Sequence, residues 1–159
     1  MKALVVYDSL YGNTEKIAEA IAEGITSADD VKHRRTNEVS LKDLESIDLL
    51  IVGAPTQAGR ASQPLQAFLN RIPQNELNNI NVAAFDTRFS IEGRRWAMRK
   101  FLGMLGYAAG RIAKGLQGKG GQLVVPPEGF IVEDREGPLK DGELERASAW
   151  AKRIAESMG

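Results

Sequence analysis

The stretch Tyr7–Thr14 gathers the residues of this chain whose types best suit binding chemistry. It reads Tyr-Asp-Ser-Leu-Tyr-Gly-Asn-Thr and carries hydroxyl and amide side chains at Ser9, Asn13 and Thr14. An apolar run precedes it and a helical pattern follows it, which predicts a strand that turns into a helix N-terminus. Free backbone N–H groups and the helix dipole favour an anion there. Because the stretch holds no Lys or Arg, a bound phosphate would be held by neutral donors, unlike in a Walker loop. The simpler alternative is a capped turn without a ligand.

The composition bounds what such a site can be used for. With 159 residues, 43% of them hydrophobic and 26% charged, the chain is typical of one globular domain spanning residues 1–159. The absence of cysteine excludes disulfides and thiolate metal sites. A lone histidine, His33, argues against a His-rich metal site and against a serine–histidine triad, so we expect no metal. The first apolar run is too short for a signal peptide and nothing approaches a membrane span, which favours a cytoplasmic protein.

The net charge of zero hides an uneven distribution of charges. Residues 87–119 contain eight Lys or Arg and one acid, Glu92, whereas residues 1–30 contain six acids and two bases. The segment 94–105 also carries Trp96 and several apolar residues among its bases. We interpret it as an amphipathic helix with a solvated basic face, and contact with an anionic partner or a membrane surface is the alternative.

Short apolar runs alternate along the chain with segments of helical periodicity. We expect strands at residues 3–7, 31–39, 47–52, 81–85 and 122–125. Helices are expected from near residue 15, after residue 40, around 65–72, at 94–104, at 107–117 and at 142–157. This alternation predicts a doubly wound, five-stranded parallel sheet of order 2-1-3-4-5 with helices on both faces.

Three loops leave the carboxyl ends of neighbouring strands in that arrangement. They cover residues 8–14, 53–61 and 86–93. Ligands of open α/β sheets bind at this edge, where the strand order reverses. Hydroxyl and amide donors of the first loop suit a phosphate, small and polar residues of the second suit a sugar, and backbone groups of the third suit a ring edge. The three loops together therefore predict a mononucleotide site.

Two motifs make a resemblance to a known family specific. The segment Val5–Ile21 resembles the flavodoxin signature at every defined position. Gly53-Ala54-Pro55-Thr56 resembles the Gly-x-Pro-Thr turn of flavodoxin-like proteins. The resemblance covers essentially the whole chain, and the uninterrupted last strand is similar to the short-chain form. It implies noncovalent binding of FMN, which would carry one- or two-electron chemistry without catalytic side chains.

The resemblance also implies which residues would bind the cofactor. Six residues of the first loop would surround the phosphate: Ser9, Leu10, Tyr11, Gly12, Asn13 and Thr14. Five residues of the second loop would meet the ribityl chain and one side of the ring: Pro55, Thr56, Gln57, Ala58 and Gly59. Three residues of the third loop would lie near the pyrimidine edge: Asp86, Thr87 and Arg88.

The chain departs from the flavodoxin pattern near the expected ring. The second loop offers Gln57 and Ala58 where flavodoxins often place an aromatic residue, and the third loop lacks the usual Gly-rich sequence with Asp and Tyr. For Trp96 the alternatives are to cover the ring or to pack into the core. For Arg88 they are to contact the flavin edge, to bind a substrate or to face solvent. Cations near the ring would stabilise an anionic reduced flavin and raise its potential. We therefore do not expect a very low-potential carrier.

Three functions remain open at this stage. The preferred interpretation is an FMN-binding protein that transfers electrons between a reductase and an acceptor. The alternatives are an FMN-dependent reductase or oxidase, of the quinone or protoporphyrinogen type, and a flavin-free interaction module. The expected partner is accordingly a redox protein or a small-molecule acceptor, and we expect no nucleic acid. A response-regulator receiver is excluded, because strand 3 ends in Gly53-Ala54-Pro55 rather than at an aspartate.

Overall fold

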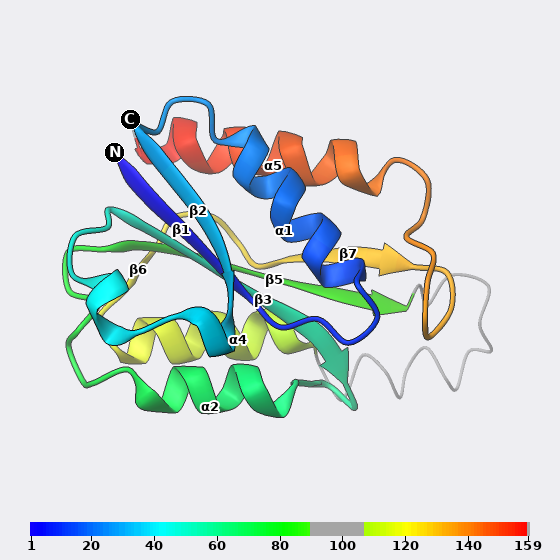
Figure 1. The fold of residues 1–159 in the computed structure, drawn as a ribbon, viewed down its shortest axis with the longest axis horizontal. Coiled ribbons are helices and arrows are strands. Elements are labelled where there is room, and N and C mark those ends of the chain that lie inside the picture. Colours follow the sequence, from blue (N-terminus) through cyan, green and yellow to red (C-terminus); the bar gives the residue numbers. More distant parts are fainter. Residues whose placement is uncertain (90–106, 159) are drawn as a thin grey trace.

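The computed structural model describes residues 1–89 and 107–158, in which helices cover both faces of a central sheet (Figure 1). The strands are β1 (Lys2–Tyr7), β2 (Asp30–Arg35), β3 (Leu49–Gln57), β4 (Arg60–Ala61), β5 (Asn81–Phe89), β6 (Gln122–Leu123) and β7 (Glu128–Val132). The α-helices are α1 (Asn13–Gly24), α2 (Gln63–Arg71), α4 (Ala108–Gly118) and α5 (Glu143–Met158). Two short 3₁₀ helices, η1 (Thr36–Glu38) and η2 (Leu41–Leu44), lie between β2 and β3.

The sheet has the order β2-β1-β3-β5-β6, and these neighbours all pair in parallel. β7 also pairs in parallel with β5, beyond β6, so β6 and β7 together occupy the fifth position. The predicted architecture and the order 2-1-3-4-5 are thus confirmed, but five strands is a wrong count for the described sheet, which has seven. Pro126 and Pro127 lack the N–H that a ladder requires, so they divide the fifth position into two strands. The remaining addition is β4, which pairs antiparallel with the end of β3.

Alternating side chains of the central strands fill two separate cores. In β1, Val5 belongs to the core beneath α1 and α5, and its neighbour Val6 belongs to the core beneath α2 and α4. In β3, Ile51 and Val52 divide in the same way. Successive side chains of a strand point to opposite faces, so nearly continuous apolar runs are buried on both sides. Figure 1 shows the resulting layers, with α1 and α5 on one face and α2 and α4 on the other.

Several element boundaries differ from those expected, and two of them matter for the site. β3 continues through Gln57, so most of the predicted loop 53–61 is strand. β5 continues through Phe89, so Asp86, Thr87 and Arg88 are strand residues rather than loop residues. The predicted strand at 31–39 is shorter and gives way to η1. The predicted helix at 94–104, with Trp96, lies outside the described residues.

Two kinds of feature are missing from the described residues. None of the helices within 1–89 and 107–158 combines the length and the apolar character that a membrane span requires. The same residues contain no cluster of three or more His, Cys, Asp or Glu side chains that would hold a metal ion.

Candidate functional site

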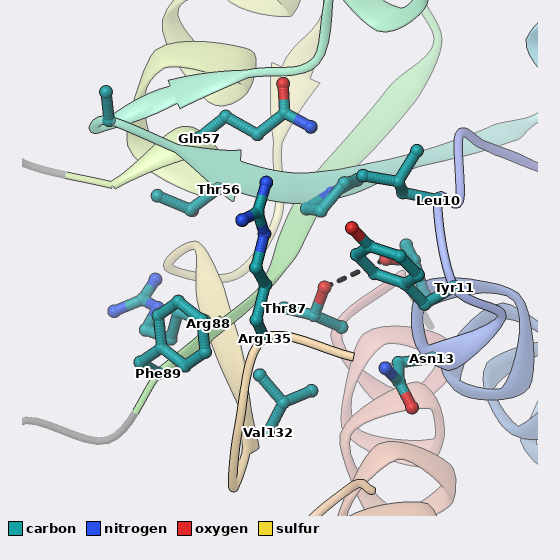
Figure 2. A pocket seen from close by; sticks show the side chains of 13 residues that line it. Leu10, Tyr11, Asn13, Thr56, Gln57, Thr87, Arg88, Phe89, Val132 and Arg135 are labelled. Atoms are coloured by element: carbon teal, nitrogen blue, oxygen red, sulfur yellow. Dashed lines mark hydrogen bonds between the residues drawn. The ribbon is translucent and has the colours of Figure 1, made fainter. Parts of the chain in front are cut away.

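A cavity of about 460 Å³ opens at the carboxyl ends of β1, β3 and β5 (Figure 2). Its size falls in the range of about 300–1,000 Å³ that is usual for small-molecule sites. It lies at the switch point of the sheet, where β1 has β2 as its neighbour on one side and β3, which follows β2 in the chain, on the other. The lining residues are Leu10, Tyr11, Asn13, Thr14, Pro55, Thr56, Gln57, Ala58, Thr87, Arg88, Phe89, Val132 and Arg135.

The structure brings most of the predicted site residues together around this cavity. All three predicted segments contribute to the lining, as Figure 2 shows for Tyr11, Thr56 and Thr87. Four predicted residues do not line it: Ser9, Gly12, Gly59 and Asp86. Three lining residues were not predicted: Phe89, Val132 and Arg135.

The first loop presents backbone donors at the start of α1. The Ser9 hydroxyl oxygen accepts hydrogen bonds from the N–H groups of Gly12 and Glu15, at 3.0 and 3.3 Å, so Ser9 shapes the turn from within. The N–H groups of Asn13 and Thr14 have no acceptor in the described part of the chain. Unpaired donors at a helix N-terminus suit an anion. The loop therefore forms a neutral anion cradle.

A pair of hydroxyl groups joins this cradle to β5. The side-chain oxygens of Thr14 and Thr87 lie 2.8 Å apart, although the two residues are 73 positions apart in the sequence. Both residues are nearly fully buried. Each hydroxyl has one hydrogen, so one of the two donates to the other and the second hydrogen stays available. The pair thus offers a further neutral donor beside the cradle.

An ion pair behind the first loop holds it in place. The guanidinium of Arg35, on β2, donates to the carbonyl oxygen of Ser9 at 3.1 Å and to the carboxylate of Glu15 at 3.3 Å. Tyr7 donates its hydroxyl to the other Glu15 oxygen at 3.1 Å. Burial, together with this hydrogen bond, raises the pKa of Tyr7 to about 12, so its hydroxyl remains a donor at neutral pH. The loop is thereby tied to two strands of the sheet.

The second predicted loop is a tight hairpin between β3 and β4. Thr56 pairs with Ala61 and Gln57 with Arg60, which leaves Ala58 and Gly59 as the two turn residues. Their φ angles are 50° and 79°, and positive values at both positions are what a type I′ turn requires. A left-handed alanine is strained, and such residues cluster at binding sites. The Thr56 hydroxyl accepts a hydrogen bond from the Ala108 N–H at 3.1 Å, so the hairpin is fixed to the start of α4.

Asp86 and Arg88, both predicted to lie near the pyrimidine edge, are paired with each other. The Asp86 carboxylate is fully buried and accepts two hydrogen bonds from the Arg88 guanidinium and one from the Ala109 N–H. The Tyr107 ring stacks on the guanidinium, whose carbon lies 3.7 Å from the ring centroid. On another side lies Gly129, where a Cβ would meet the guanidinium at 2.2 Å. Arg88 borders the cavity, but its charge is already neutralised by Asp86.

Apolar side chains surround the mouth of the cavity. Leu10 and Tyr11 are adjacent in the sequence and are 60% and 43% exposed. Phe89 adds a second aromatic ring at the end of β5. Figure 2 shows Leu10 and Tyr11 on one side of the cavity and Phe89 on the opposite side. These residues supply the apolar walls that Gln57 and Ala58 do not.

The unpredicted lining residues lie in or next to strands that extend beyond the expected strand ends. Phe89 belongs to the predicted third loop, 86–93, but lies one residue beyond the three that the resemblance assigns to the cofactor. Val132 and Arg135 were missed because the last strand was ended before Pro126. The apolar run Phe130-Ile131-Val132 was the signal that strand structure resumes after the two prolines.

Comparison with known proteins agrees with this site. The profile of the flavodoxin domain matches residues 4–125. A flavodoxin of Aquifex aeolicus is 37% identical over 73 residues, covering 45% of this chain and 40% of that protein. An NAD(P)H dehydrogenase (quinone) of Azorhizobium caulinodans is 36% identical over 91 residues, covering 44% of this chain and 46% of that protein. Each match therefore spans less than half the length of the relative.

A solved structure extends the likeness to nearly the whole chain. The structure of a flavodoxin from the domain Archaea superimposes with a TM-score of 0.73 and 28% sequence identity. The superposition covers 98% of this chain and 97% of the archaeal one. The likeness in fold therefore extends over nearly the whole of both chains.

Proposed function

The chain belongs to the flavodoxin family, whose members bind FMN, and we propose that it transfers electrons between a reductase and an acceptor. When bound, FMN supplies the redox chemistry by taking up and releasing one or two electrons. The protein binds the cofactor, orients it and limits its contact with water. In this proposal residues 1–159 act as one flavodoxin-like unit in the cytoplasm.

One observation carries the proposal: neutral donors that have no partner among residues 1–89 and 107–158 face a cavity of nucleotide size. The free N–H groups of Asn13 and Thr14 and the hydroxyl pair of Thr14 and Thr87 suit a phosphate. They suit it better than they suit a metal, because N–H groups turn a partial positive charge toward the ligand and the described residues hold no cluster of three or more His, Cys, Asp or Glu side chains. The helix dipole of α1 adds a favourable potential for a dianion. The donor set of this chain therefore fits the phosphate of FMN.

The remaining walls would hold the rest of the cofactor. We assign Pro55, Thr56, Gln57 and Ala58 to the ribityl chain and one edge of the ring, where the strained hairpin gives backbone groups a fixed direction. Tyr11 and Phe89 would shield the ring from water on opposite sides of the cavity. Asp86 would act indirectly, since it fixes Arg88 and the start of α4 rather than touching the ligand.

Reduction kinetics test the role in electron transfer. The FMN-loaded protein is mixed anaerobically with NADPH or NADH, alone and together with a separate flavodoxin reductase. A carrier is reduced quickly only when the reductase is present. Rapid reduction by the nicotinamide nucleotide alone contradicts the carrier role.

A second candidate function is an FMN-dependent quinone reductase. The similarity to the dehydrogenase of Azorhizobium caulinodans, which is named for that activity, favours this candidate. It requires direct reduction by the nicotinamide nucleotide and multiple turnovers with a soluble quinone. If reduction needs the separate reductase and no quinone turns over, this candidate is excluded.

A further inference from the structure

A hairpin after β7 forms a further wall of the cavity. In residues 131–140, which we call the 131–140 hairpin, Val132 bridges to Leu139 in antiparallel fashion. Backbone hydrogen bonds close it, from Lys140 N to the Ile131 oxygen and from Glu133 N to the Pro138 oxygen, each at 2.9 Å. The tip is turned by a bond of 3.0 Å from the N–H of residue 137 to the carbonyl of residue 134. The segment therefore has a defined course rather than that of an open loop.

The tip of this hairpin is attached to the anion cradle. The Asn13 side-chain amide donates to the carbonyl oxygen of Glu136 at 3.1 Å, although the two residues lie 123 positions apart. Gly137 packs so closely on Asn13 that a Cβ there would lie 2.9 Å from the amide oxygen. Asn13 is only 8% exposed, so this contact is partly buried. The residue between Asp134 and Glu136 is thus held beside the first turn of α1.

That residue is Arg135, and its side chain enters the cavity. Figure 2 shows it crossing from the hairpin, past Thr87, toward Thr56. Its guanidinium has no hydrogen-bond or ion-pair partner within residues 1–89 and 107–158. Arg88, the other cation of the lining, is paired with the buried Asp86 carboxylate. Arg135 is therefore the cation of the described lining whose charge is not neutralised by a protein group.

We propose that Arg135 binds the phosphate group of FMN, an inference that rests on the proposed function. The first loop holds only neutral donors, and the 131–140 hairpin places a positive charge in the same cavity, on a side chain that passes Thr87. A guanidinium donates two parallel hydrogen bonds to a phosphate, and these charge-assisted bonds are stronger than neutral ones. Arg135 thereby sets a preference for FMN over riboflavin, which lacks the phosphate.

Calorimetric titration of the full chain with FMN and with riboflavin tests this inference. Arg135→Gln should weaken FMN binding by about tenfold or more and leave riboflavin binding unchanged, because one charge-assisted contact is lost. Arg135→Lys should retain part of the affinity for FMN, since it keeps the charge without the planar fork. Lys152→Gln on α5 is the matched control, because it removes an exposed positive charge away from the cavity and should bind FMN as the wild type does.

Ionic strength provides a second readout. FMN affinity of the wild type should fall with added salt more steeply than that of Arg135→Gln. Salt screens the attraction between the Arg135 guanidinium and the phosphate, which the variant lacks. The unliganded Arg135→Gln protein should unfold at the wild-type temperature, since the side chain is exposed and has no protein partner in the described structure.

Three results would overturn the inference, and they separate it from the proposed function. Equal losses for FMN and riboflavin would place Arg135 against the ring or ribityl chain instead. Unchanged FMN binding in Arg135→Gln would show that Arg135 makes no contact with the cofactor. Failure of the wild type itself to bind FMN would overturn the proposed function, and the inference with it.

Discussion

The Arg88 guanidinium donates two hydrogen bonds, at 2.7 and 2.8 Å, to the fully buried carboxylate of Asp86 on the same strand. The same carboxylate accepts the N–H of Ala109 at 2.8 Å. The pair therefore joins the carboxyl end of β5 to the first turn of α4. It also neutralises the charge of Arg88 beside the expected flavin ring. Arg88 therefore raises the reduction potential of the flavin less than an unpaired cation would.

Asp86→Ala is expected to lower the free energy of unfolding by about 3 kcal/mol, because it leaves a half-buried guanidinium without its partner and the Ala109 N–H without its acceptor. Urea unfolding measures this change. Asp134→Ala, at an exposed position in the 131–140 hairpin, is the control and should change stability by much less. A loss from Asp86→Ala no larger than that of the control would show that the pair does not stabilise the fold.

Thr14→Ala is expected to weaken FMN binding by about 1 kcal/mol or more, because it removes one hydroxyl donor to a charged phosphate. Calorimetric titration with FMN measures the loss. Thr14→Ser keeps the hydroxyl group beside Thr87 and should bind nearly as tightly as the wild type. If Thr14→Ala binds FMN with wild-type affinity, the phosphate does not lie at this cradle.

Arg35→Ala is expected to weaken FMN binding by about 0.5–1 kcal/mol, since the pair with Glu15 and the bond to the Ser9 carbonyl no longer hold the first loop. Arg34→Ala is the matched control. Arg34 is its neighbour on β2, and among the described residues its side chain donates to the carbonyl oxygen of the adjacent His33, so its removal should leave FMN binding unchanged. Equal effects of the two variants would indicate a general influence of surface charge.

Glu143→Gln is expected to lower stability near neutral pH by about 2 kcal/mol, because Glu143 accepts charge-assisted hydrogen bonds from Arg146. Burial would by itself raise the pKa of Glu143, but hydrogen bonds from Arg146 and from the Ile131 N–H outweigh it and hold the pKa below 4.5. A carboxylate with a lowered pKa contributes stability above its unfolded value and loses it as the pH falls through the folded value.

The stability difference between the wild type and Glu143→Gln should therefore shrink as the pH drops below 4.5. Urea unfolding across a pH series measures both curves. A difference that stays constant into that acidic range would contradict the assigned role of the Glu143 carboxylate.

The sequence predicted the parts of this site that depend on local pattern. Tyr7–Thr14 forms the expected turn into α1, and residues 55–58 reach the same cavity. The resemblance assigned Asp86 to the cofactor edge, and its position in the sequence does not reveal that it pairs with Arg88 and the Ala109 N–H. Arg135 was missed because its position depends on where the chain resumes pairing after Pro127 and on a contact with Asn13. Such long-range pairings leave no periodic signal in one sequence.

Titration of the unliganded wild-type chain with FMN tests the central claim most directly. The account predicts saturable binding of one FMN per chain, tighter than the binding of riboflavin, with a yellow protein that retains flavin absorbance after dialysis. A chain that stays colourless and shows no heat of binding with FMN would contradict it, and would leave a flavodoxin fold that serves as an interaction module.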